Sequence, residues 1–302
     1  MAIQNLLAAC IVYVDDFLLT RHADYDMKQL LSAFSWGSQT SLTVDTPLEF
    51  KGKEIHLRFD NNRKLYLLDI KQEKFIKAFR NAKISGKKDE PLKTEDFPEY
   101  RSVAGSLQWV AGQTRPDVAS TVSLHSRGSK ATYGDLAAMY DAVNHLHQTF
   151  DKGFTMNPTA IDESTLVVAD ADSSWANAEN FASQHGCLVL LADARATEVA
   201  TPACLIDWKS SRSARVCRST LAAEASAADS SVDRSSFCNL MLSEVLQRIP
   251  SFKITQPLRM LQVTDCKSLY DSVCVPKIHQ WRTNAPSSST STVATCTGHR
   301  LA

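Results

Sequence analysis

Between residues 165 and 274, three strand-like segments, a long helical segment and a fourth strand-like segment follow one another. Alternating or continuous apolar runs predict the strands, which fall at 165–170, 185–192, 203–209 and 260–265. Apolar residues at helical spacing predict a long helix over 219–247 and a short one over 267–273. This order predicts a mixed sheet with a long helix packed across it, which is an α/β (α+β) arrangement.

Two of these strands end on carboxylates. Asp170 and Asp265 close strands that we expect to lie side by side, and Glu224 falls in the first turns of the long helix. Hard divalent cations select carboxylate oxygens, and without a cation clustered acids repel one another and at least one pKa rises. We therefore predict a Mg²⁺ (or Mn²⁺) site made by these three residues. Asp172 is the nearest alternative to Asp170, because it faces the same side if the strand continues.

A second acid pair lies near the N-terminus, within the run IVYVDDFLLT that begins at Ile11. Asp15 and Asp16 separate two β-prone segments, which predicts a β-hairpin with the acids at its tight turn. Adjacent carboxylates repel each other unless a cation neutralises them, so both residues are also candidate metal ligands. An ordinary exposed turn is the alternative interpretation.

Between this hairpin and residue 164, the chain alternates strand-like, helical and polar segments. Strands are predicted at 48–59 and 64–68, and helices at 24–36, 72–79, 100–119 and 133–150. Residues 87–99 and 151–164 are rich in charged or helix-breaking residues, which is typical of a surface connector and an interdomain linker. The Ser/Thr-rich stretch within 278–302 shows little apolar periodicity and is expected to be disordered.

Charge is balanced, with 33 Lys plus Arg against 33 Asp plus Glu in 302 residues. No global basic field therefore points to a nucleic-acid partner, and any such surface has to be local. One local candidate is a basic run before the long helix, which either neutralises phosphates or is simply a solvated loop. Its members are Lys209, Arg212, Arg215 and Arg218.

The eight cysteines show no CxxC pairing, which argues against a zinc module and a disulfide framework. Reduced thiols indicate an intracellular location, in the cytoplasm or nucleus. No apolar run approaches the roughly 20 residues that a bilayer requires, so we expect no membrane association.

Several strings occur in a fixed order: YVDD, then YRSVAGSLQW with TRPDV, then VADADSSW, IDWKS, STLAAEA and TDCKSL. Together they resemble the Pol polyprotein of copia-like LTR retrotransposons, in which the C-terminal part of reverse transcriptase precedes ribonuclease H. The resemblance implies a partial reverse transcriptase palm and connection at 1–150 and a ribonuclease H-like domain at 164–277. It also implies cleavage of the RNA strand of RNA–DNA hybrids by two-metal catalysis, with Asp170, Glu224 and Asp265 as catalytic residues.

Other expectations follow from departures from the family pattern. A further metal-binding Asp upstream of YVDD is absent, so we do not expect polymerase activity from this chain alone; the rest of the Pol polyprotein is a potential partner. After Asp265 the only acid is Asp271, which comes too early to be the fourth acid of the family. A catalytically dead remnant that only binds nucleic acid is therefore one alternative, and an interaction protein built on residues 100–150 is another.

Overall fold

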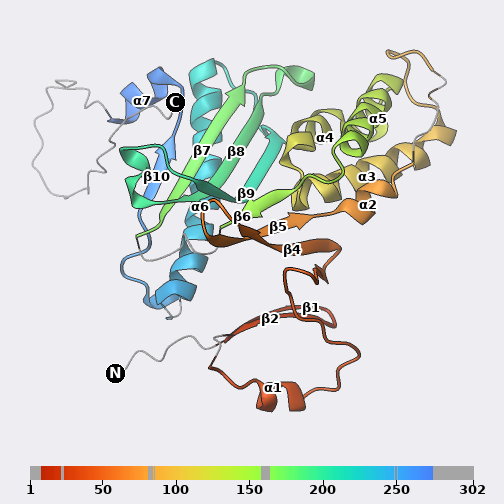
Figure 1. Ribbon diagram of the computed structural model, residues 1–302. Helices are drawn as coiled ribbons and strands as arrows, with labels where there is room; N and C mark the ends of the chain where they lie inside the picture. The colour runs from red at the N-terminus through yellow and green to blue at the C-terminus, as the bar shows by residue number, and fades with distance from the viewer. Residues whose placement is uncertain are drawn as a thin grey trace, which may run out of the picture.

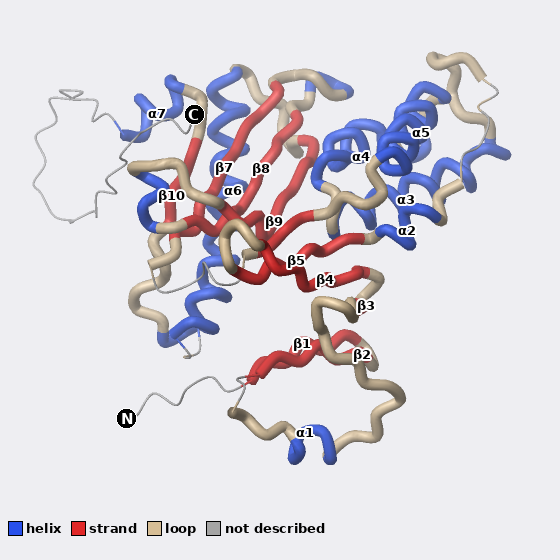
Figure 2. The backbone as a smooth tube through the Cα atoms, viewed as in Figure 1, coloured by secondary structure: helices blue, strands red, loops and turns tan. Residues whose placement is uncertain are grey.

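The computed structural model describes residues 8–21, 24–80, 84, 86–157, 164–247, 249 and 251–274. Within them, strands form one two-stranded and two four-stranded sheets, with helices packed around the larger sheets (Figure 1). Figure 2 shows the strands gathered centrally and the helices mostly to either side. The expected mixed α/β architecture with packed helices is confirmed at this level. The predicted disordered stretch, 278–302, lies outside the described residues.

The predicted N-terminal hairpin is present as β1 (Ala8–Tyr13) and β2 (Asp16–Arg21). Val14 supplies the positive φ, 57°, that a tight two-residue hairpin turn needs. The helix predicted over 24–36 is wrong in extent, because only α1 (Lys28–Ser32) forms. The residues after α1 do not continue the helix. Instead, the side chains of Phe34 and Trp36 pack on the hairpin, where they contact Phe17.

The second sheet has the order β3 (Leu48–Phe50), β4 (Lys53–Asp60), β5 (Leu65–Lys71) and β6 (Phe154–Met156). Residues 48–59, predicted as one strand, are two strands, because Lys51 and Gly52 both take positive φ and turn the chain back. The predicted linker 151–164 is also partly wrong: β6 lies inside it and pairs with β5.

A helical region follows the second sheet and comprises α2 (Glu73–Lys77), α3 (Phe97–Gln113), α4 (Ala119–His125) and α5 (Tyr133–Gln148). The single helix predicted over 100–119 is interrupted, since Pro116 opens a 3₁₀ turn at Pro116–Val118 and the chain changes direction there. Buried apolar side chains fill the space between α3 and α5, among them Leu107, Val110, Met139 and Leu146. This cluster is the larger apolar core of the described chain.

The third sheet contains β7 (Leu166–Ser174), β8 (Gln184–Ala192), β9 (Ala203–Arg212) and β10 (Met260–Val263), in the order β10-β7-β8-β9. β10 runs parallel to β7, and the other neighbours are antiparallel. The long helix α6 (Thr220–Gln247) covers one face, where Leu242 and Leu246 pack near Val167 and Val189. The helix α7 (Lys267–Cys274) follows β10. The predicted strand and helix order of this region is confirmed.

No helix among the described residues is both long enough and apolar enough to cross a membrane. The expected intracellular compartment stays a prediction.

Candidate metal centre

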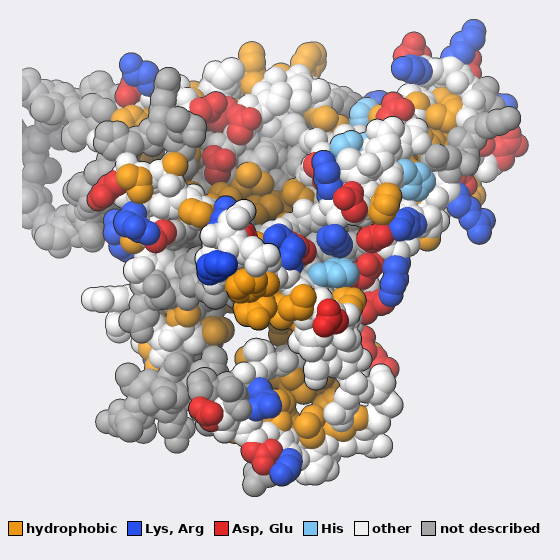
Figure 3. Space-filling model, viewed as in Figure 1, with side chains coloured by type: hydrophobic (Ala, Val, Ile, Leu, Met, Phe, Trp, Pro, Cys, Tyr) orange, Lys and Arg blue, Asp and Glu red, His pale blue; other side chains and the backbone are white. Residues whose placement is uncertain are grey.

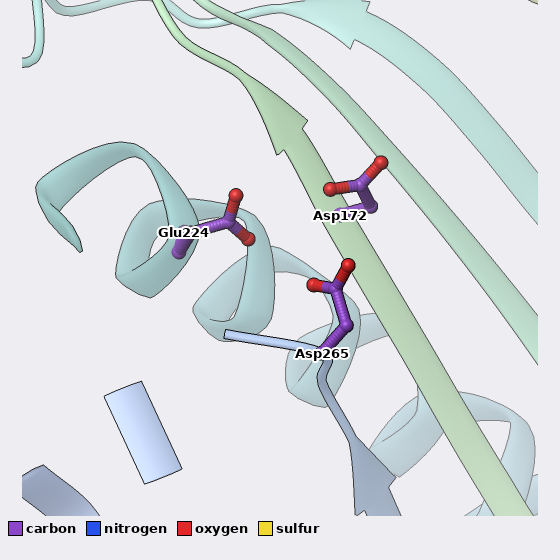
Figure 4. Close-up of side chains that lie close together, drawn as sticks. All are labelled: Asp172, Glu224 and Asp265. Carbon is purple, nitrogen blue, oxygen red and sulfur yellow. The ribbon is translucent and has the colours of Figure 1, made fainter. Parts of the chain in front are cut away.

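Three acidic side chains meet where β7, β10 and α6 come together (Figure 4). β10 ends at Val263, opposite Asp170, so β7 runs on beyond its last pair with β10 and carries Asp172 into the open. Asp265 lies two residues past the end of β10, and Glu224 lies in the first turns of α6. Figure 4 shows the three carboxylates pointing toward one another from these separate elements.

One carboxylate oxygen from each of Asp172, Glu224 and Asp265 lies within 4.8 Å of the other two. Asp172 and Asp265 are exposed, whereas Glu224 is half-buried. Figure 3 shows acidic side chains gathered between the end of β7 and α7, so the cluster opens to the surface. A cation can therefore reach the site from solvent.

Glu224 carries the strongest sign that a positive partner belongs here. Its Oε1 accepts a hydrogen bond from the Ser173 hydroxyl at 3.1 Å, but its Oε2 is buried and has no hydrogen-bond partner. Burial raises the pKa of Glu224; the Ser173 hydrogen bond opposes this shift, and the nearby charges of Asp172 and Asp265 add to it. Three carboxylates, one of them with an unsatisfied buried oxygen, could bind a metal ion.

Asp170, the residue predicted from the sequence, lies outside this three-acid group. It is half-buried on β7, and its pKa is raised first by burial and then by the charges of Asp172 and Asp265. The group contains instead the alternative, Asp172. The strand was expected to stop at Asp170, whereas pairing with β8 continues four residues further, to Ser174, and the exposed acid on this extension is Asp172.

Asp15 and Asp16, the other predicted metal ligands, are exposed on the N-terminal hairpin. Asp15 lies in the turn as predicted, whereas Asp16, also expected in the turn, begins β2 and pairs with Tyr13. Within the described part of the chain, no group of three potential ligands includes either residue. The structure therefore gives these acids no metal site of the kind found at the third sheet.

The four predicted basic residues lie along one connection. Lys209 is exposed on β9, Arg212 ends that strand, and Arg215 and Arg218 are exposed between β9 and α6. Lys209 lines the same cavity, of about 260 Å³, as Asp170 and Asp172. Trp208 and Ser210 line this cavity too, and because successive side chains of a strand point to opposite faces, the Lys209 side chain lies on the face of the sheet that α6 covers.

Comparison with known proteins finds no protein-family model, no curated protein and no solved structure that matches the chain. The argument for function therefore depends on the residues and geometry described above.

Proposed function

We propose that residues 164–274 form a ribonuclease H-like nuclease domain that hydrolyses the RNA strand of RNA–DNA hybrids. In this proposal Asp172, Glu224 and Asp265 hold Mg²⁺ or Mn²⁺, and the chain is part of a copia-like retrotransposon Pol polyprotein. The observation that carries the proposal is the meeting of three carboxylates from distant parts of the sequence at one exposed point. Three like charges this close together repel one another, and a bound cation would relieve that repulsion.

The arrangement of the third sheet supports the proposal. Three consecutive antiparallel strands, a long helix and a fourth strand parallel to the first follow the order that the resemblance to ribonuclease H implies. The order brings the ends of β7 and β10 together although almost ninety residues separate them, and it lays the start of α6 beside both. The motif order upstream supports the assignment of 1–150 to a reverse transcriptase C-terminal part.

The side chains have distinct tasks in such a site. Divalent cations supply an activated water and stabilise the departing oxyanion in phosphodiester hydrolysis. Asp172, Glu224 and Asp265 would hold the cations, and the Ser173 hydroxyl orients Glu224 by its hydrogen bond. The exposed Lys209, Arg215 and Arg218 supply positive charge for the phosphate backbone of the nucleic acid.

A nucleic-acid-binding protein without nuclease activity is the second candidate. The exposed Arg215 and Arg218 favour it, because basic side chains on a surface connection bind phosphates whether or not a metal is present. This candidate predicts salt-sensitive binding of the hybrid with no cleavage.

Cleavage of an end-labelled RNA–DNA hybrid separates the two candidates. We expect Mg²⁺-dependent cleavage of the RNA strand by the wild type, and its loss in Asp172→Asn, because the variant removes one charged metal ligand. Asp229→Asn is the matched control, since Asp229 is exposed on α6 and lies outside the cluster. Equal cleavage by wild type and Asp172→Asn would contradict the proposal, and binding without any cleavage would favour the second candidate.

A further inference from the structure

A cavity of about 260 Å³ lies between the start of α4 and the third sheet. Its residues come from two parts of the chain that are far apart in sequence. The helical region contributes Pro116, Ala119 and Ser120, and the sheet contributes residues of β7, β8 and β9. The cavity reaches the metal centre, because Asp172 belongs to both.

Contacts beside the cavity hold its two walls in a defined relation. The indole Nε1 of Trp208, on β9, donates a hydrogen bond to the carbonyl oxygen of Ala111, near the end of α3, at 2.7 Å. The Trp208 ring also contacts Phe154 of β6 edge-on, with ring centroids 5.7 Å apart. Figure 1 shows α4 lying beside β9. The helical region is thus anchored to the sheet at this strand, and the space next to the anchor stays open.

The lining has the chemistry of a nucleotide site. Apolar groups form much of the wall, including Pro116, Ala119, Leu188 and Trp208. Polar groups stand among them, with the carboxylate of Asp172 on the side of the metal centre and the hydroxyls of Ser120 and Ser210 as hydrogen-bond donors. Ligand pockets begin at about 300 Å³, so this cavity suits one small unit and not a larger ligand.

We infer that this cavity binds one nucleotide unit of the strand held at the metal centre. The apolar wall packs against the sugar and base, while the hydroxyls of Ser120 and Ser210 contact the phosphate. The inference rests on the proposed function and adds to it, because it makes the helical region, through α4, the second wall of the substrate site. The nuclease site would then be incomplete in the sheet region alone.

Adenosine 5′-monophosphate in the presence of Mg²⁺ is a suitable probe, since it offers one nucleotide and no phosphodiester bond to cleave. We expect the ¹H–¹⁵N resonance of the Trp208 indole to shift saturably as the probe is added to the full chain. Ala119→Leu and Ser120→Leu fill the cavity from the helical wall, and we expect each to weaken probe binding by about tenfold or more. Thr121→Leu, on the same helix but outside the lining, is expected to bind as the wild type does.

Binding of Mn²⁺ to the same variants separates the two proposals. We expect Ala119→Leu and Ser120→Leu to keep the Mn²⁺ affinity of the wild type, because neither residue belongs to the acid cluster. A wild type that binds Mn²⁺ while the Trp208 resonance ignores the probe would overturn the cavity inference and leave the metal centre standing. Probe binding that neither leucine variant weakens would overturn it equally, whereas failure to bind Mn²⁺ at all would contradict the proposed function.

Discussion

Arg115, in the helical region, and Glu224, at the third sheet, are both withdrawn from solvent but differ in their partners. The Arg115 side chain is 3% exposed, and its guanidinium donates to both carboxylate oxygens of Asp117 and to the Thr149 carbonyl. Oε1 of Glu224 accepts a hydrogen bond from the Ser173 hydroxyl, whereas its Oε2 is buried and has no hydrogen-bond partner. Unlike Arg115, Glu224 therefore has a polar atom that this chain leaves unsatisfied.

The pKa values follow the same division. Burial disfavours the charge of Asp117, but hydrogen bonds from Arg115 and His145 outweigh it and hold the pKa of Asp117 below its ordinary value. The pKa values of Asp170 and Glu224 are raised instead, by burial and by neighbouring acids. A paired charge stabilises its own fold, whereas clustered acids without a cation oppose it. The difference separates a structural ion pair from a cluster of acids that could bind a metal ion.

The largest effect on stability is expected from removing Arg115, the buried charge that has partners. Arg115→Ala removes the buried guanidinium and its hydrogen bonds to both carboxylate oxygens of Asp117 and to the Thr149 carbonyl. We expect it to lower the free energy of unfolding in urea by about 3 kcal/mol. Lys74→Ala, which breaks the exposed pair with Glu49, is the control and should cost less than about 1 kcal/mol. Equal losses of stability in the two variants would contradict the claim that the buried pair of Arg115 and Asp117 stabilises the fold more than an exposed pair does.

Mn²⁺ is expected to stabilise the folded protein by binding to the acid cluster of Asp172, Glu224 and Asp265. At a free concentration a hundred times its dissociation constant, a ligand that binds only the folded state adds about 2.7 kcal/mol to the free energy of unfolding. We expect thermal melts of the wild type to show this gain, and Asp172→Asn and Glu224→Gln to lose most of it. Asp229→Asn, on α6 outside the cluster, should keep the gain in full. A gain that survives in all three variants would place the binding elsewhere.

Asp170→Asn sharpens the comparison in the absence of metal. Because the pKa of folded Asp170 is raised above 3.8, its ionised form destabilises the folded protein at neutral pH. We expect the variant to be more stable than the wild type at pH 7 in EDTA, by about 1 kcal/mol at most. The advantage should shrink as the pH falls through the raised pKa and vanish below 3.8, where wild-type Asp170 is itself protonated. Melts across this pH range that keep a constant gap would contradict the account.

The smallest effect is expected at the hairpin acids. Asp15→Asn and Asp16→Asn alter exposed side chains that belong to no three-ligand group among the residues described. We expect neither to change the Mn²⁺-induced shift of the melting temperature. Loss of that shift in either variant would show that the hairpin contributes to metal binding after all.

Much of the third sheet was predictable, because its strands are apolar runs and its long helix has regular spacing. Glu224 and Asp265 were found in this way, since a helix start and a strand end are local features. Local sequence features could not decide between Asp170 and Asp172. Strand propensity is low at the end of β7, in Asp172, Ser173 and Ser174. Pairing with β8 keeps these residues extended.

Errors elsewhere arose in the same way from tertiary contacts or single turn residues. Lys51 and Gly52 fold one predicted strand into two, and Pro116 interrupts one predicted helix. The hydrogen bond between Trp208 and Ala111 joins residues almost a hundred positions apart, so no local sequence pattern predicts it. The cavity beside α4 was therefore visible only in the fold.

A crystal structure of the protein grown with Mn²⁺, with anomalous scattering used to locate the ion, tests the central claim most directly. The account predicts an anomalous peak within coordination distance of carboxylate oxygens from Asp172, Glu224 and Asp265 together. A saturated crystal whose Mn²⁺ lies elsewhere, with these three carboxylates left uncoordinated, would contradict it.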